Sequence, residues 1–422
     1  MIESLAASRY RRTVAARLSR RRSPLLGVAL VAATVALASL PAPTVAEPRS
    51  FPRTLSADRP GLAARLQRIV DAGRAEFGFP GVSVAVLFPD GTIWTGASGL
   101  ADVARGIPVT RETPFALASI SKSFVAGVVM GLIEEGRLHL GDAVARLLPD
   151  VRLGSRSIDP RITVRQLLDH TSGLGDFLTT GALDKAVLAA PTEHWTTVRA
   201  LSYVPKPLAE PGLRFYYSNT NYVLLGLIVE RLSGQSLAAE LRERWIEPLG
   251  LRTASFQGAE PPGSTPAMAY RFTSGSPGEA PIDMTDGSAI RPFTAITTAA
   301  GAAGSIMASA EDTGRWLAAL VTASSLRPAT VARMVADAGR STAVIPRLRY
   351  GLGLQAHVID GHPSIGHSGR FLGQRAEARY FPKDGLTIVV LTNQSRTDPA
   401  VILRALLAYL LPSHAELALH AS

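Results

Sequence analysis

The chain has 422 residues, of which 46% are hydrophobic and 18% charged, so its composition excludes an intrinsically disordered protein. Its formal charge of +10 is concentrated near the N-terminus: seven arginines and one glutamate lie within residues 1–46, and the rest of the chain carries +4 without a long basic run. Charge therefore does not support a nucleic-acid partner. The absence of cysteine excludes disulfides, thiolate metal sites and cysteine nucleophiles.

Residues 1–46 have the pattern of an export signal. A basic head precedes an apolar run from Pro24 to Leu40, and small residues follow up to Ala46. This pattern predicts a signal peptide and an exported protein, either secreted or kept in the periplasm or cell envelope. The residues from Ser19 to Arg22 also allow a twin-arginine signal, although the rest of that motif is missing. The alternative is an uncleaved membrane anchor, because the apolar run is near the lower length limit for a span; cleavage would leave no stable span.

The periodicity of the remaining chain predicts strands near both ends and helices between them. Residues 47–58 indicate a linker, and residues 257–291, rich in Pro, Gly, Ser and Thr, indicate a long loop. Helical spacing predicts helices over Leu62–Phe77, Phe124–Glu135 and Val401–Leu411, and further helical segments over about 140–335. Alternation and β-branched residues predict strands over Val82–Phe88, Thr92–Ala97, Tyr350–Val358, Glu377–Phe381 and Leu386–Thr392.

This arrangement predicts an α/β (α+β) domain over residues 59–412, followed by a tail over 413–422. One antiparallel sheet would be formed from both chain ends and flanked by helices, with a mostly helical insertion at about 140–335.

The first candidate catalytic motif is Ser119-Ile120-Ser121-Lys122, which leads into an apolar helical run. If a helix begins near Ser119, the hydroxyl of Ser119 and the amine of Lys122 lie on one face and touch. A serine needs a base to become a nucleophile, and a buried lysine can lose its proton whereas arginine cannot. The chain uses 40 Arg and only four Lys, so a lysine here indicates chemistry more than charge. The alternative for Lys122 is an ordinary surface residue of a first helical turn.

Two further motifs are weak when taken alone. Tyr217-Ser218-Asn219 precedes an apolar helix, and its asparagine could be a simple helix cap. In His367-Ser368-Gly369, glycines before and after the pair allow a ligand to approach the backbone, but a lone histidine beside a strand is usually structural.

The three motifs in this order resemble those of the serine β-lactamases and D-alanyl-D-alanine carboxypeptidases, the penicillin-recognising serine hydrolases. That family carries S-x-x-K, then Tyr-x-Asn or Ser-x-Asn, then K-T-G or H-T-G/H-S-G; here the motifs are separated by about 98 and 150 residues. The chain is most similar to the class C β-lactamase-like branch, which uses Tyr-x-Asn. Further similarities are Leu168–Leu174, Pro211-Gly212, Ala300-Gly301 to Asp312 and Tyr350–Gly353, and the resemblance covers about residues 60–410.

The resemblance implies a β-lactamase/transpeptidase-like fold and a role for each matched residue. Ser119 would attack a carbonyl and form an acyl-enzyme, while Lys122 and Tyr217 share the proton, without a choice between them as base. Asn219 would bind a substrate amide or Lys122. In the third motif, Ser368 would hydrogen-bond the substrate, and Gly369 would let it approach. The backbone N–H groups of Ser119 and Arg370 would form the oxyanion hole.

His367 stands where many members of the family have lysine, so the charge of this motif is expected to depend on pH. The resemblance then leans towards carboxypeptidase and esterase members. Peptidase members hold a substrate carboxylate with a cation, and three arginines remain candidates for it: Arg291, Arg370 and Arg375.

The sequence therefore predicts a serine hydrolase acting on D-alanyl peptides or related amides, with β-lactams or small esters also open. Its partner would be such a small molecule or a cell-wall peptide. The alternative is a penicillin-binding sensor or scaffold of the same fold that does not turn over. No cofactor is expected, and no metal either, because there is no H-E-x-x-H and the eight histidines lack close ligand spacing.

Overall fold

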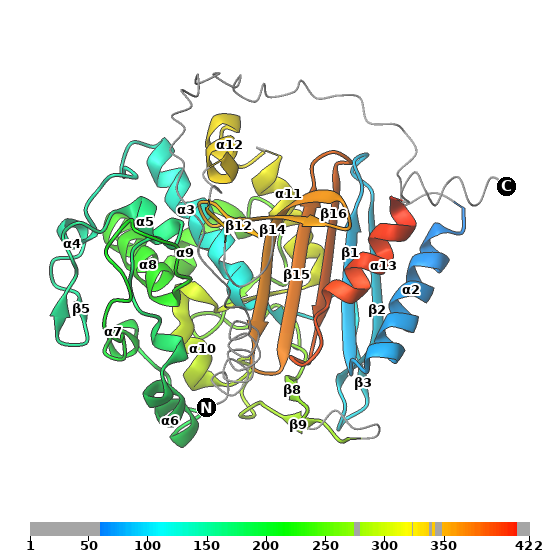
Figure 1. Ribbon diagram of the computed structural model, residues 1–422. Helices are drawn as coiled ribbons and strands as arrows, with labels where there is room; N and C mark the ends of the chain where they lie inside the picture. Colours follow the sequence, from blue (N-terminus) through cyan, green and yellow to red (C-terminus); the bar gives the residue numbers. More distant parts are fainter. Residues whose placement is uncertain (1–59, 274–278, 323, 337–339, 342–347, 412–422) are drawn as a thin grey trace, which may run out of the picture. The chain divides into compact units, whose positions relative to one another are not determined.

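The computed structural model describes residues 60–273, 279–322, 324–336, 340–341 and 348–411 (Figure 1). The predicted signal peptide, linker and C-terminal tail lie outside these residues. Within the described part, no helix combines the length and apolarity needed to cross a membrane.

The largest element is an antiparallel sheet in the order β11-β12-β13-β14-β15-β16-β1-β2-β3. Strands β1 and β16 join the two ends of the domain, with Val84 opposite Val390. The prediction of one antiparallel sheet built from both chain ends is therefore confirmed. Its strands are β1 (Gly81–Leu87), β2 (Ile93–Asp102), β3 (Ile107–Pro108), β11 (Arg340–Ser341), β12 (Arg349–Tyr350), β13 (Gln355–Ile359), β14 (His362–Phe371), β15 (Gln374–Phe381) and β16 (Leu386–Thr392).

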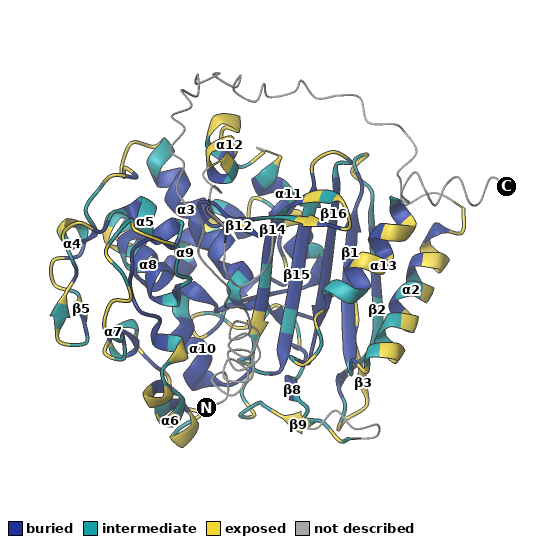
Figure 2. Cartoon of the chain, viewed as in Figure 1, coloured by how far each residue is buried: buried dark blue, intermediate teal, exposed yellow. Residues whose placement is uncertain are grey.

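Helices cover both faces of this sheet, and its central strands are buried (Figure 2). Helices α2 (Leu62–Phe77) and α13 (Ala400–Leu410) lie side by side on one face (Figure 1). There they pack against every second residue of β1, including Val82 and Val84. Because successive strand residues point to opposite faces, Ala85 of the same strand joins the other core cluster.

The opposite face carries the helical part of the chain, which includes α3 (Ser121–Glu134), α8 (Asn219–Ser233) and α11 (Ala310–Val321). Helix α3 is buried from Ser121 to Leu132, which agrees with its apolar sequence all round. The other helices are α4 (Val144–Leu147), α5 (Val164–Leu168), α6 (Gly181–Ala189), α7 (Thr197–Leu201), α9 (Leu237–Leu241), α10 (Thr294–Ala300) and α12 (Pro328–Ala336). Single turns are η1 (Ala118–Ile120), η2 (Phe177–Thr179), the π-helical η3 (Arg242–Ile246) and η4 (Gly301–Ala303). Short strands form three small sheets, β4 (Phe115–Ala116) with β10 (Ile306–Ala308) and β7 (Ser255–Phe256), β5 (Arg152–Leu153) with β6 (Arg156–Ser157), and β8 (Tyr270–Arg271) with β9 (Ile282–Asp283).

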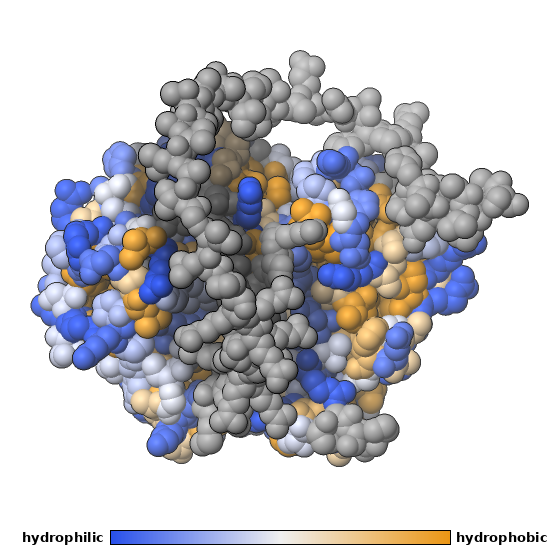
Figure 3. Space-filling view, in the orientation of Figure 1, coloured by the Kyte–Doolittle hydropathy of each residue, from blue (hydrophilic) through white to orange (hydrophobic). Residues whose placement is uncertain are grey.

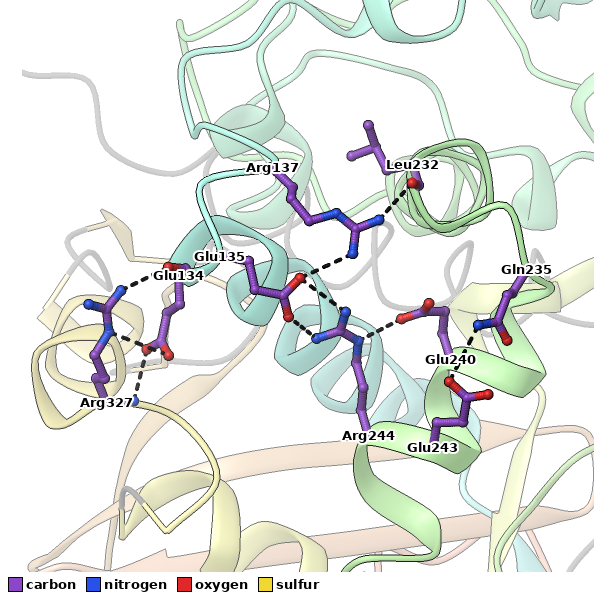
Figure 4. Close-up of polar contacts among 9 residues, drawn as sticks. All are labelled: Glu134, Glu135, Arg137, Leu232, Gln235, Glu240, Glu243, Arg244 and Arg327. Atoms are coloured by element: carbon purple, nitrogen blue, oxygen red, sulfur yellow. Dashed lines mark hydrogen bonds and ion pairs between the residues drawn. The ribbon is translucent and has the colours of Figure 1, made fainter.

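The C-terminal end of α3 is held by a network of ion pairs (Figure 4). Arg244, from η3, contacts both carboxylate oxygens of Glu135, and its Nε donates to Glu240 at 2.6 Å. Arg137 also donates to Glu135, at 3.1 Å, and to the carbonyl oxygen of Leu232 at 2.7 Å. The network ties the end of α3 to α8 and α9, so the helix is fixed at the end opposite the Ser119 motif.

The polarity of the face that Figure 3 presents does not single out a docking site. On the face that Figure 3 presents, hydrophilic and hydrophobic residues of the described part are interspersed. The most exposed large hydrophobic residues, Val198 and Leu213, are 76% and 66% exposed. Scattered apolar residues of this kind are normal on soluble proteins.

Near the C-terminus, one predicted strand is wrong in its bounds and another strand was not predicted. The strand predicted over Tyr350–Val358 is broken into β12 and β13 by a turn at Gly353, which has φ +82°. A Cβ there would lie 2.2 Å from the Cβ of Ala126, so glycine lets the turn rest on α3. In addition, β14 was not predicted as a strand, because Pro363 and its two glycines dilute the β-branched pattern. The loop predicted over residues 257–291 contains the short β8–β9 pair.

Candidate active site

The Ser119 motif lies in a turn held between two strands. Ser119 belongs to η1, directly before α3, and is partly exposed. The turn follows β4, and the N–H of Leu117 donates to the carbonyl oxygen of Ile306 at 2.9 Å. Ala118 has φ +48°, a conformation that is strained for a residue other than glycine and that clusters at functional sites. Gly369 of β14 packs on the other side, where a Cβ would lie 2.1 Å from the carbonyl oxygen of Leu117.

Lys122 is the central charged group of the site. Its side chain is fully buried, and its Nζ lies 3.0 Å from Oγ of Ser119. The same nitrogen lies 2.7 Å from Oδ1 of Asn219 and 2.7 Å from the carbonyl oxygen of Ala303. Burial lowers the pKa of Lys122 from 10.5 to about 7, against the opposing effect of the Asp176 carboxylate. Near neutral pH the amine is therefore present in both protonation states.

These three contacts determine where the lone pair of the neutral amine points. A neutral amine has two N–H donors and one lone pair. The carbonyl oxygen of Ala303 can only accept, and so can Oδ1 of Asn219, provided that the amide has the orientation described below. Both N–H groups are then used, and the lone pair is left for the hydroxyl of Ser119. The geometry thus suits proton transfer from Ser119 to Lys122.

A buried carboxylate that sequence reasoning missed fixes the amide of Asn219. Oδ2 of Asp176 lies 2.8 Å from Nδ2 of Asn219, and a carboxylate accepts hydrogen bonds, so the amide must turn Oδ1 towards Lys122. Asp176 is 8% exposed, and burial raises its pKa. The only sequence signal for Asp176 was that it lies two residues after Leu168–Leu174, a segment similar to the family.

Tyr217 lies beside Lys122, as the motif requires. The Nζ of Lys122 is 5.0 Å from the centroid of the Tyr217 ring. The ring of Tyr217 packs against the ring of His170, with centroids 4.2 Å apart, and against Tyr350. Ser119, Lys122, Tyr217 and Asn219 are therefore brought together from two distant stretches of the chain.

His367 lies in the same region but is neutral. Its Nδ1 lies 2.6 Å from the carbonyl oxygen of Ser368, which can only accept, so Nδ1 carries the proton. Its Nε2 then accepts from the hydroxyl of Tyr350 at 2.9 Å. Burial, followed by the positive charge of Lys122, lowers the pKa of His367 to about 3. The expectation of a charge that varies near neutral pH is therefore wrong, because the imidazole is buried with both nitrogens engaged.

The rest of the third motif follows the edge of β14. Ser368 points away from the face of His367, and both its Oγ and its N–H lie within 3.3 Å of Oε1 of Gln355. Oε1 of Gln355 also accepts from Arg379, which pairs with Glu377, and sequence reasoning missed all three. The N–H of Ser368 points to the side of β14 on which Gln355 lies. N–H groups two residues apart point to the same side of a strand, so the N–H of Arg370 points to that side as well.

The three arginine candidates for a substrate carboxylate differ in their surroundings. Arg291 is buried and donates to the backbone carbonyls of Ala267 and Ser288. Arg375 pairs with Asp398 at 3.5 Å. Arg370 is exposed, and within the described ranges its side chain has no hydrogen-bond or ion-pair partner. Of the three, it is the one whose guanidinium is available to a ligand.

No metal site is apparent at this centre: across the described stretches, three or more His, Asp or Glu side chains do not come together in a way that could hold an ion.

Comparisons with known proteins show the family and fold to which the chain is similar. The family model "Beta-lactamase" matches residues 66–411. The chain is 30% identical to penicillin-binding protein 4 of Amycolatopsis lactamdurans over 344 residues, which cover 78% of this chain and 85% of that protein. It is 36% identical to esterase EstB of Burkholderia gladioli over 247 residues, or 56% of this chain and 60% of the esterase.

Solved structures of the same fold include a D-stereospecific amidohydrolase from Streptomyces sp., with 27% identity and a TM-score of 0.69 over 83% of this chain and 99% of that one. A D-amino acid amidase from Ochrobactrum anthropi SV3, complexed with D-phenylalanine, has 25% identity and a TM-score of 0.70 over 82% and 97% of the two chains. With its matching fold and with relatives named as penicillin-binding protein, esterase and amidase, the chain belongs to the Beta-lactamase family and is a serine hydrolase.

Proposed function

We propose that this protein forms an acyl-enzyme through Ser119 and hydrolyses D-alanyl peptides or related amides. The observation that carries the proposal is the contact set of Lys122, which leaves its lone pair for the hydroxyl of Ser119. The pKa of Lys122, about 7, lets the amine be neutral before the reaction and protonated after it.

The reaction has two halves. Oγ of Ser119 bonds to the substrate carbonyl carbon while its proton passes to Nζ of Lys122, and the carbonyl electrons move to the oxygen. The N–H groups of Ser119 and Arg370 stabilise this oxyanion. The bond to the leaving amine then breaks as the amine receives the proton from Lys122, directly or through Tyr217. Water attacks the acyl-enzyme in the same way and releases the acid and Ser119.

Two observations support the substrate class. The solved relatives include proteins named for D-stereospecific and D-amino acid amide hydrolysis. Because His367 is neutral, Arg370 is the cation next to the proposed oxyanion site that is available for a peptide carboxylate. An exported enzyme, as residues 1–46 predict, would encounter such peptides outside the cytoplasm.

The central test is labelling with a fluorophosphonate, followed by mass spectrometry of the labelled peptide. Wild-type protein is expected to carry one label on Ser119, and Ser119→Ala none. Ser121→Ala is the matched control, because Ser121 is a neighbouring serine whose hydroxyl accepts from the backbone N–H of Ile306. Persistent labelling of Ser119→Ala would exclude this nucleophile.

Substrate panels then test the class. A D-alanyl-D-alanine peptide, a D-alanine amide, nitrocefin and p-nitrophenyl esters are compared by kcat/KM. Arg370→Ala is expected to lower kcat/KM for the peptide more than for the ester. A burst of one equivalent without further turnover on every substrate would contradict hydrolysis and favour the sensor.

A further inference from the structure

His170 is a buried imidazole to which the proposed reaction assigns no step. It is fully buried and lies two residues after α5, at φ +59°. A residue with a Cβ is strained in this left-handed conformation, so the surrounding structure must hold it there.

His170 makes three contacts with the Tyr217 segment, two hydrogen bonds to its backbone and one contact with its ring. The backbone carbonyl of His170 accepts the N–H of Tyr216 at 2.8 Å. Nδ1 of the imidazole accepts the N–H of Ser218 at 3.2 Å. The ring packs on the phenol of Tyr217, with centroids 4.2 Å apart and the planes inclined by 33°. The peptide N–H groups on both sides of Tyr217 and its ring are thus all held by one residue.

The hydrogen bonds also fix the protonation of His170. A backbone N–H can only donate, so Nδ1 must be unprotonated and the proton of the neutral ring is on Nε2. Asn221 lies 3.2 Å from the same Nδ1, which it can reach with its Nδ2 as a second donor. Nε2 has no hydrogen-bond partner in the part of the chain that the structure describes, and the ring of Tyr350 stands edge-on at 4.6 Å. Protonation of Nδ1 would break these contacts.

We propose that His170 is a positioning residue that holds the phenol of Tyr217 beside Lys122 for proton transfer at Ser119. The proposal rests on the function proposed above, because Tyr217 matters only if Ser119 is acylated. The strained backbone of His170 brings its carbonyl and its Nδ1 to the same side, where both meet the Tyr217 segment. Without these bonds the phenol would have other rotamers and backbone positions available.

Two substitutions separate positioning from packing. Asn adopts the left-handed conformation more readily than other residues with a Cβ, and its Oδ1 can accept the N–H of Ser218. Leu fills the space but cannot accept a hydrogen bond. His170→Leu is expected to lower the maximal labelling rate of Ser119 by about 100-fold, the range of a displaced acid–base group, with the half-saturating probe concentration changed by less than about threefold. His170→Asn is expected to restore most of the rate.

A double-mutant cycle with Tyr217→Phe shows whether His170 acts through Tyr217. In the Tyr217→Phe background, adding His170→Leu or His170→Asn is expected to change the rate by less than about threefold. Leu406→Ala, in the core under α13, is the stability control, since it destabilises the protein on the other face of the sheet. Melting temperatures are measured for all variants.

The outcomes distinguish this proposal from the proposed function. If wild-type Ser119 is not labelled, the proposed function fails, and the positioning role fails with it. If Ser119 is labelled but the effects at His170 and Tyr217 are independent, only the positioning role is overturned. It is also overturned if His170→Asn is as slow as His170→Leu, or if the losses follow melting temperature as in Leu406→Ala. Should His170→Leu not fold, His170→Phe, whose ring also cannot accept a hydrogen bond, replaces it in the cycle.

Discussion

The charge of Asp176 should set the pH at which Ser119 becomes reactive. Only the neutral form of Lys122 can accept the proton of Ser119, and the pKa of this lysine is about 7. The labelling rate should therefore fall about tenfold for each pH unit below 7 and level off above it. The carboxylate of Asp176 favours the ammonium form, so Asp176→Asn should lower the pKa of Lys122 and shift the acidic limb to lower pH.

The size of this shift follows from the contacts. One amide group separates the two charges, with hydrogen bonds of 2.7 and 2.8 Å at its ends. At a separation of roughly 7 Å and an effective dielectric constant of about 20, the interaction is about 2 kcal/mol. Since one pH unit corresponds to about 1.4 kcal/mol, the midpoint should move down by about 1.5 units. At pH 6 the variant should then react several-fold faster than the wild type, provided that Asn219 keeps its orientation.

The assay is the rate of fluorophosphonate labelling between pH 5 and 9. Asp312→Asn is the matched control, because Asp312 is similarly buried and bonded to Thr253, with no contact to Lys122. Its midpoint should stay with that of the wild type. A midpoint of Asp176→Asn that is unchanged or higher would refute the assignment of Lys122 as the base under the influence of this carboxylate.

Two further variants test the frame of the site. In Gly369→Ala, the new Cβ would clash with the carbonyl oxygen of Leu117. The substitution should lower the free energy of unfolding by about 1–3 kcal/mol in urea titrations. It should also slow the labelling of Ser119 by more than the unfolded fraction of the variant explains. Arg244→Ala leaves the buried carboxylate of Glu240 without its ion-pair partner, and should cost about 1–3 kcal/mol of unfolding free energy while the labelling rate of the folded protein stays unchanged (Figure 4). An equal loss of labelling in both variants would contradict the separate roles of the two ends of α3.

The fold was predictable where a single periodicity determines an element. The predicted bounds of α2 (Leu62–Phe77) and β16 (Leu386–Thr392) agree with the structure, since one has a clear apolar stripe and the other is apolar except for two threonines. By contrast, β14 is held by pairing with β13 and β15, and its Gly369 lets Leu117 and Ala118 approach closely. Local sequence carries no signal for such contacts, so the strand was missed.

The site was predictable to the extent that its residues form linear motifs. Ser119 and Lys122 are one helical turn apart, so local geometry predicts their contact. Asp176 and Asn219 are joined only by tertiary structure, and nothing in the sequence near Asp176 indicates that its carboxylate is buried. The neutral state of His367 likewise depends on burial and on Tyr350, which a motif does not record.

The pairing of β1 with β16 has a consequence for the order in which the protein can fold. Val82 and its partner Thr392 are about 300 positions apart, so the N-terminal hairpin is synthesised long before the strand that completes its inner edge. Until then that edge exposes unpaired peptide groups, and long-range pairing of this kind is slow to form. A chain truncated before β16 would therefore be unable to close its sheet and would keep that edge open to pairing with other chains.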